Sequence, residues 1–161
     1  MKATTLLERQ HRNLQQLCEA VERGSPSIRE SLLPQLAGDL AAHIAVEEAI
    51  FYPAACEALR EDGWMRSGRA RHAQARSSLE RTLDAAFDSD EFDRAIGELR
   101  VAVELHAEEQ EEILFPQLER ALDDAMMRRL AISMLTLYHA KVEAGYARET
   151  DRPSSSRASH A

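Results

Sequence analysis

The sequence has no long hydrophobic run, and none of its apolar stretches approaches the roughly 20 residues that a membrane-spanning helix needs. Its first residues, 1–8, also lack the extended apolar core of a signal peptide. We therefore expect a cytoplasmic protein with no membrane partner.

Cysteine is scarce, and the two present, Cys18 and Cys56, do not form a Cys-x-x-Cys metal or redox pair. We interpret both as buried, reduced thiols. Positive charge is also in deficit, with 20 Lys and Arg against 28 Asp and Glu and a net charge of -8. Because binding to nucleic-acid phosphates needs clustered cationic side chains, we expect no nucleic-acid partner, and metal cations suit this chain better.

Alternating β-branched runs, which are typical of strands, are absent too, whereas apolar residues recur at helical spacings of three and four. Thr4 or Thr5 with Glu8 resembles a capping box, and Gly24-Ser25-Pro26 resembles a helix stop with a left-handed glycine followed by a helix start. Asp88-Ser89-Asp90 and Asp123-Asp124 suit later helix starts. The predicted helices begin near Thr4, span roughly 27–60 and 69–87, and restart near 90 and 123.

Short connections between these helices predict an all-α fold, an up-and-down four-helix bundle of two repeated αα-hairpins plus a short fifth C-terminal helix. A chain of 161 residues suits one domain. We expect the bundle to occupy residues 1–149 and residues 150–161 to form a disordered polar tail, because the tail has no periodicity.

One motif is written twice, over 43–53 and again over 106–116. Each copy has a histidine, a carboxylate four or five residues later, two apolar residues and a proline ten residues after the histidine. Each histidine is also preceded, about one hairpin upstream, by another: His11 before His43, and His72 before His106. The chain therefore uses one hairpin twice.

All four histidines fall on the inward apolar stripes of their helices, and Glu47 lies one turn after His43. Buried polar groups need partners, because leaving them unpaired costs several kcal/mol. Neutral imidazoles suit iron, copper, zinc or nickel, and a carboxylate can span two metals. The pattern predicts a site for two metal ions at the bundle axis.

With these paired His-x-x-x-Glu-Glu and His-x-x-x-Gln-Glu segments, residues 4–121 resemble the hemerythrin-like, or HHE cation-binding, family. The resemblance implies four helices around a non-haem di-iron centre, with two Fe per chain. In this family the centre binds oxygen or senses oxygen, iron or nitric oxide. It also implies that His11, His43, His72 and His106 are terminal ligands and that Glu47 is a bridging carboxylate.

Two positions depart from that pattern. Gln110 stands where the family commonly has a second bridging glutamate, and the next residue, Glu111, could reach a metal only if the helix widened locally into a π-turn. We retain Glu111 as a candidate ligand. Arg76 stands one turn after His72, where oxygen-carrying members have a fifth histidine, and a guanidinium must pair with a carboxylate, such as Glu48 or Glu111, or turn outward.

Three functions follow from these observations. The leading one is a cytoplasmic hemerythrin-like non-haem di-iron protein that binds or senses oxygen, peroxide, nitric oxide or iron. The second is a di-iron enzyme that reduces peroxide or oxidises ferrous iron. The third is a helical interaction module with an impaired metal site, for which Gln110 and Arg76 would be the marks. The expected partners are metal ions and a small ligand, and any protein partner is unknown.

Overall fold

The computed structural model describes residues 1–148, and the predicted tail over 150–161 lies outside this range. The described residues form helices and no strands, so the predicted all-α class is confirmed. None of these helices is long and apolar enough to cross a membrane. The elements are α1 (Ala3–Arg23), α2 (Pro26–Val46), η1 (Glu47–Phe51), α3 (Tyr52–Leu59), α4 (Gly63–Asp84), α5 (Asp90–Glu109), η2 (Gln110–Leu114), α6 (Phe115–Ala121) and α7 (Asp124–Ala144).

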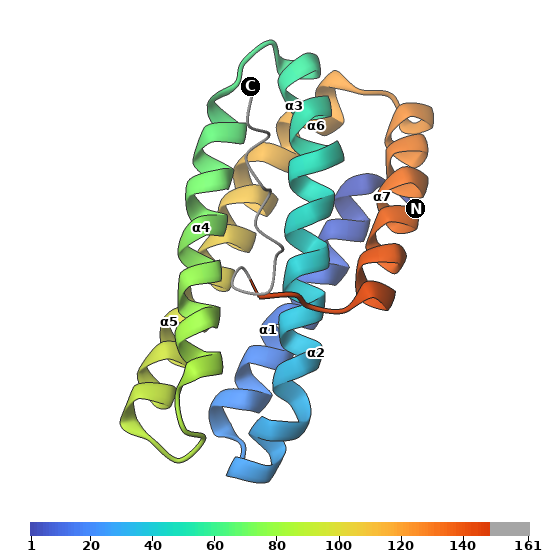
Figure 1. Cartoon of the computed structure of the whole chain (residues 1–161). Coiled ribbons are helices and arrows are strands. Elements are labelled where there is room, and N and C mark those ends of the chain that lie inside the picture. The colour runs from blue at the N-terminus through green and yellow to red at the C-terminus, as the bar shows by residue number, and fades with distance from the viewer. Residues whose placement is uncertain (149–161) are drawn as a thin grey trace, which may run out of the picture.

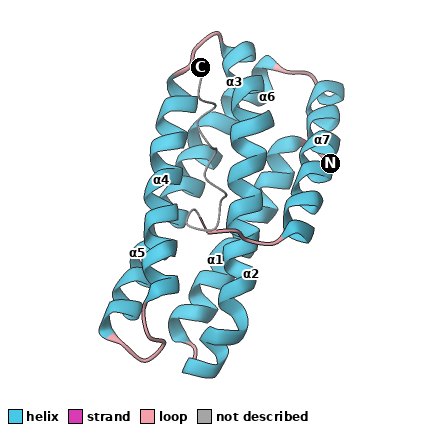
Figure 2. Ribbon diagram, in the orientation of Figure 1, coloured by secondary structure: helices cyan, strands magenta, loops and turns pink. Residues whose placement is uncertain are grey.

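Two long helices of the bundle each contain a π-helical turn: α2 continues through η1 into α3, and α5 continues through η2 into α6. The first hairpin, formed by α1 and the α2–α3 helix, packs against the second, formed by α4 and the α5–α6 helix (Figure 1). The fifth helix, α7, lies along α1 and α2 outside the four-helix core. Short loops join all of these helices (Figure 2).

The helix ends test the predicted capping signals. The side chains of Ser89 and Asp123 accept backbone N–H bonds at the starts of α5 and α7, as predicted. The predicted capping box at the start of α1 is wrong, because α1 has no side-chain cap and the Thr4 hydroxyl donates to Glu119. Gly24 is not left-handed either, with φ of -73°. It is required by close approach, since a Cβ there would lie 2.7 Å from Cγ2 of Ile28.

The connection between the two hairpins is shorter than predicted. We expected residues 61–68 to be a loop, but α4 begins at Gly63 and includes Trp64 and Gly68. Gly68 lies on the helix face that crosses α3, where an added Cβ would overlap the Tyr52 ring. This glycine therefore marks a close helix contact and not a turn.

The π-turns change which residues face inward. Regular helical spacing continued from His43 and His106 would place Ile50 and Ile113 inside the bundle. However, Ile113 is 49% exposed and Ile50 is only partly buried. The residues that follow them, Phe51 and Leu114, are buried instead, because each π-turn adds one residue to its helix. A proline follows each π-turn, and the wider turn accommodates a residue that has no N–H to donate.

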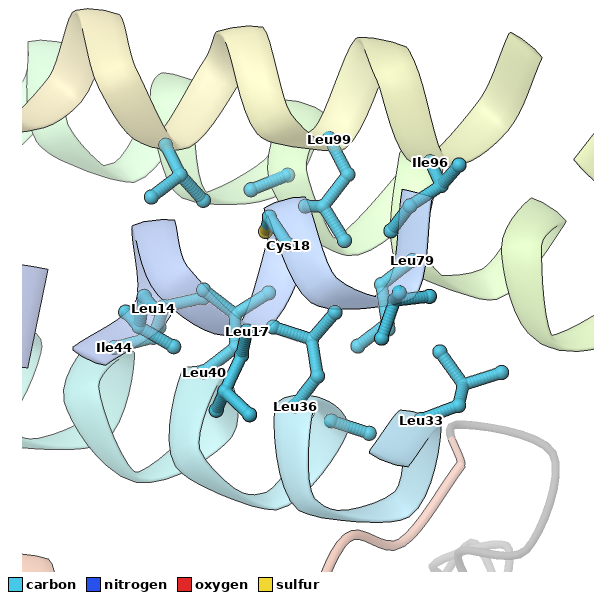
Figure 3. Packing of buried hydrophobic residues seen from close by; sticks show 14 of the residues in the cluster. Leu14, Leu17, Cys18, Leu33, Leu36, Leu40, Ile44, Leu79, Ile96 and Leu99 are labelled. Carbon is cyan, nitrogen blue, oxygen red and sulfur yellow. The ribbon is translucent and has the colours of Figure 1, made fainter. Parts of the chain in front are cut away.

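Two hydrophobic clusters lie along the bundle, one on each side of the predicted site. The first cluster fills the end of the bundle that contains the start of α2 and is lined mainly by leucines, including Leu14, Leu36 and Leu99 (Figure 3). The second contains Phe51, Phe115 and two buried methionines of α7. The helix segments between these clusters carry the polar residues that the sequence analysis selected.

Candidate metal centre

The four predicted histidines come from four different helices and meet inside the bundle. His11 lies on α1, His43 on α2, His72 on α4 and His106 on α5. The rings of His11, His43 and His106 have centroids 5.0 to 5.5 Å apart, and the His72 ring is 5.2 Å from that of His106. All four are buried, although His106 retains 9% exposure.

Glu47 supplies the carboxylate at the centre of this group. It is the first residue of η1 and has no exposed surface. Ligand atoms of His11, His43, Glu47 and His106 all lie within 4.8 Å of one another, which is the spacing of a cation site.

The two carboxylate oxygens of Glu47 face different pairs of histidines. Oε1 lies 3.4 Å from Nε2 of His43 and 4.0 Å from Nε2 of His11. Oε2 lies 2.8 Å from Nε2 of His72 and 3.1 Å from Nε2 of His106. Each oxygen thus belongs with one nitrogen from each of two helices, as in a carboxylate that bridges two ions.

The outer nitrogens of three histidines are already paired. Nδ1–H of His43 donates to the Gln10 amide oxygen (2.9 Å). Nδ1 of His11 contacts the Glu111 carboxylate (2.9 Å), and Nδ1 of His72 contacts that of Glu48 (2.8 Å). A hydrogen bond at Nδ1 fixes the ring orientation and leaves the Nε2 lone pair for a metal, which is how ligand histidines are usually held.

Burial and charge set the protonation of the centre. Burial lowers the pKa of His11 to about 3 and holds the pKa of His43 well below its ordinary value, although the Glu47 charge opposes both shifts. Burial would raise the pKa of Glu47, but the surrounding imidazoles outweigh it and hold that pKa well below its ordinary value. At neutral pH Glu47 is therefore an ionised carboxylate, and His11 and His43 are neutral imidazoles.

His72 differs because it lies between two carboxylates. Burial lowers its pKa, but hydrogen bonds to Glu47 and Glu48 outweigh this effect, so the pKa is raised. A metal ion bound at Nε2 would take the place of the proton shared with Glu47.

Unpaired buried atoms test whether the residues present suit a metal. Within the described chain, four buried side-chain atoms have no hydrogen-bond partner: Gln10 Nε2, His11 Nε2, Glu47 Oε1 and Gln110 Oε1. Three of these atoms, His11 Nε2, Glu47 Oε1 and Gln110 Oε1, belong to residues at the centre and carry lone pairs. Each of them costs desolvation free energy if it is left without a partner. Nitrogen and oxygen donors of this kind suit iron, so the residues fit the metal that the family resemblance implies.

Gln110 lies at the start of η2, as Glu47 lies at the start of η1, so the two occupy matching places in the repeat. Its amide N–H donates to the Tyr52 hydroxyl (2.9 Å), and its amide oxygen has no partner. Burial raises the Tyr52 pKa, which keeps this hydroxyl neutral. The second hairpin thus contributes a neutral oxygen where the first contributes a carboxylate.

The two departures from the sequence pattern have definite positions. Glu111 lies in the π-turn η2, the local widening that coordination by Glu111 would need. Its carboxylate nevertheless contacts Nδ1 of His11 (2.9 Å) and Arg12 (2.8 Å), so it reaches the centre through His11. Arg76 turns outward, with 46% of its side chain exposed, and pairs with Glu48 (3.5 Å). Ala75 takes its place on the inward stripe. The outward turn and the pairing with Glu48 are both among the alternatives that the sequence left open for Arg76.

Two polar residues of the site, Gln10 and Glu48, were not among the predicted ligands. Glu48 follows Glu47 in the motif, and we had named it only as a possible partner for Arg76. Gln10 precedes His11 on a helix face that points towards α2, and its bond to His43 spans 33 residues. The only signal in the sequence was a polar residue next to a stripe histidine.

Fold and site together define the class, a helical bundle that encloses a His/Glu cluster suited to a metal ion. The family model described as "Hemerythrin HHE cation binding domain" matches residues 2–118, and the chain belongs to this family. A crystal structure of a hemerythrin HHE cation binding domain-containing protein, the Rv2633c homolog from Mycobacterium kansasii, is similar with a TM-score of 0.78. The two are 20% identical over 89% of each chain, so this likeness shows the fold. No curated protein matches the chain.

Proposed function

We propose that this protein is a hemerythrin-like non-haem di-iron protein that binds or senses oxygen, peroxide, nitric oxide or iron. The observation that carries the proposal is the arrangement around Glu47, whose two oxygens each face two imidazole nitrogens from different helices. One ion would be held by His11, His43 and Oε1, and the other by His72, His106 and Oε2. Iron bound there would supply a redox-active Lewis acid.

The neutral side chain at position 110 distinguishes this centre. Two divalent ions bring four positive charges, and Glu47 is the single anionic group among the atoms that face inward. Gln110 offers one amide oxygen to a cation, whereas a glutamate would offer two oxygens and a negative charge. Together with the outward turn of Arg76, this leaves room for an exogenous ligand on the side of His72 and His106.

A small pocket lies on the opposite side of the histidines from Glu47. Its volume is about 10 Å³, close to what one water molecule needs, and its walls include Leu14, Leu40 and Val103. Such walls favour a small molecule of low polarity, such as oxygen or nitric oxide, over one that needs several hydrogen bonds. The pocket supports ligand binding more than iron storage.

Metal analysis tests the proposal directly. Protein reconstituted with ferrous iron without air and then desalted should hold close to two Fe per chain. Glu47→Ala should lose most of this iron, and His139→Ala, an exposed histidine on α7, should keep it. Wild-type protein that retains no iron under these conditions, and no zinc or manganese when it is reconstituted with either, would refute the metal centre and leave the helical interaction module.

A further inference from the structure

Three hollows meet at one side chain, that of Arg71 on α4. The first is the small pocket beside the four histidines, and Arg71 is part of its wall. The second is a surface groove of about 170 Å³ along α4 and α5, where Val101 and Leu105 are about half exposed. The third lies beside His106 and Gln110 and is also bordered by Arg71. Figure 1 shows α4 and α5 side by side along this face.

The repeat explains why the inner pocket lies next to the second hairpin. In the first helix of each hairpin, the residue three after the histidine is Leu14 in α1 and Ala75 in α4. In the second helix of each hairpin, the residue three before the histidine is Leu40 in α2 and Val103 in α5. The second hairpin therefore has the smaller side chain at both matched positions. Ala102, which lines both the inner pocket and the surface groove, is small as well. Little more than Arg71 and Ala102 separates the pocket from the groove.

Arg71 is held in place by one ion pair across the two helices. Its Nε donates to Glu109 Oε2 at 2.6 Å, with 39% and 29% of the two side chains exposed. Arg71 precedes His72 and Glu109 precedes Gln110 in the sequence, so the pair lies directly outside the centre. Arg71 and His106 together line two of the three hollows. His106 is also the most exposed of the four histidines.

We propose that the Arg71–Glu109 ion pair gates the path by which small neutral molecules reach the pocket. The opening of this gate sets their entry and exit rates. The proposal rests on the proposed function, because it takes the pocket to be the place of the exogenous ligand. A partly exposed ion pair is weak enough to break often. When it breaks, the flexible Arg71 side chain can swing into the surface groove and join the groove to the pocket.

The test uses nitric oxide as the probe, because a neutral molecule is not steered by the charge that the variants remove. Stopped-flow measurement on ferrous-loaded protein gives the association rate, and a nitric oxide scavenger gives the dissociation rate. Arg71→Ala removes the side chain that forms the gate. Glu109→Gln keeps the size of the side chain at position 109 but removes the ion pair. Arg66→Ala is the matched control, since Arg66 pairs with Asp62 on the exposed side of the same helix.

Both rates should rise together by about fivefold in Glu109→Gln, the factor that corresponds to an ion pair of about 1 kcal/mol. They should rise further in Arg71→Ala, while the equilibrium dissociation constant and the iron content stay within about twofold of wild type, an allowance below 0.5 kcal/mol. Arg66→Ala should match wild type. Unchanged rates in Arg71→Ala would overturn the proposal, and so would a change confined to the dissociation rate.

A second readout needs no metal. Diethyl pyrocarbonate should modify His106 of metal-free Arg71→Ala several times faster than in wild type or Arg66→Ala, as measured by peptide mass spectrometry. If wild type binds no iron, the proposed function fails, whereas this experiment still decides whether Arg71 gates access to the pocket. If Arg71→Ala does not fold by circular dichroism, Arg71→Met, which keeps the aliphatic stem, replaces it in both measurements. Equal modification rates of His106 in all variants would refute the proposal that Arg71 gates access to the pocket.

Discussion

At the scale of single residues, the centre depends on groups that hold the outer nitrogens of its histidines. Glu111 holds His11 and Glu48 holds His72, and each of these carboxylates is paired in turn with an arginine. The hydrogen bond from His72 and the Arg76 charge together hold the pKa of Glu48 below its ordinary value. Glu48 therefore stays ionised and keeps the His72 imidazole oriented over a wide pH range.

This arrangement predicts the effect of neutralising either carboxylate. Glu111→Gln and Glu48→Gln should each weaken iron binding by roughly 10-fold to 100-fold, the usual cost of losing an outer partner of a ligand histidine. The stoichiometry at saturating iron should stay the same. Competition with a calibrated chelator measures the change. Glu112→Gln, at an exposed neighbour of Glu111, is the control. If Glu111 were itself a ligand, its variant would instead lose iron stoichiometry.

The neutral oxygen of Gln110 leads to a second prediction at this scale. Gln110→Glu adds a negative charge beside the proposed ions, which bring four positive charges against the single charge of Glu47. We expect slower loss of iron to a chelator, together with a lower reduction potential, because the oxidised centre gains more from the added charge. Tyr52 would then donate to the new carboxylate in place of accepting from the amide. A variant that loses iron faster than wild type would contradict this reasoning.

At the scale of the elements, the π-turns and the close helix crossings position the residues of the centre. Each π-turn begins at an inward residue, Glu47 or Gln110, and shifts the following apolar residues by one position. Beyond η1, Tyr52 packs against the backbone of α4 at Gly68 and reaches back to Gln110 on η2. One aromatic residue thus joins three of the four bundle helices.

Substitution of Gly68 tests this crossing. Gly68→Ala should destabilise the protein by about 1–3 kcal/mol, because the new Cβ overlaps the Tyr52 ring and neither helix can move freely. Gly97→Ala is the control: its nearest neighbour is the flexible Glu22 carboxylate at 3.6 Å, so this helical glycine should gain up to about 1 kcal/mol. Urea unfolding measures both changes. Equal effects of the two variants would show that the Tyr52 contact is unimportant.

At the scale of the whole molecule, the centre gathers most of the buried polar side chains of the described residues. It lies between two hydrophobic clusters, so its cost in the metal-free chain is borne by the packing of the whole bundle, including α7. Metal binding should therefore raise the stability of the complete fold. Acid should lower it, because several groups at the centre must change protonation.

The effect of metal removal follows from binding linkage. Iron-loaded protein should melt at a higher temperature than chelated protein, since a ligand present at about 100 times its dissociation constant adds about 2.7 kcal/mol to the folded state. The difference should vanish in His43→Ala and persist in His139→Ala. Calorimetry on matched samples measures it. An unchanged melting curve after chelation would mean that the folded chain had held no metal.

The pH dependence of the metal-free protein has a definite sign. The pKa of His11 falls from 6.5 in the unfolded chain to about 3 in the folded one, so the unfolded chain binds more protons between these values. Stability should therefore decrease as the pH falls through this window, by about 1.4 kcal/mol per pH unit for each such histidine. His43, whose pKa is also lowered, and Glu47, whose stabilising charge is lost by protonation, act in the same direction.

His72 opposes this trend. Its pKa is raised in the fold, so its contribution is complete below 6.5 and is lost as the pH rises through the folded pKa. Urea unfolding at several pH values between 6.5 and 4.5, where the His72 contribution is complete and constant, measures the slope that His11 and His43 set. His11→Gln should flatten it by up to one proton per molecule. Parallel curves for the variant and wild type would contradict the assigned burial of His11.

The sequence alone determined the helical class, the doubled hairpin and the inward place of all four histidines and Glu47, because helical periodicity and motif spacing are local properties of the chain. Only the tertiary structure decided the partners across helices: Glu111 with His11, Gln10 with His43, and the outward Arg76 with Glu48. It also decided the register after Glu47 and Gln110, since a π-turn forms where neighbouring helices compensate the strained backbone. The apolar stripe of a helix determines which way a side chain points, whereas the packing of the helices determines which residues that side chain contacts.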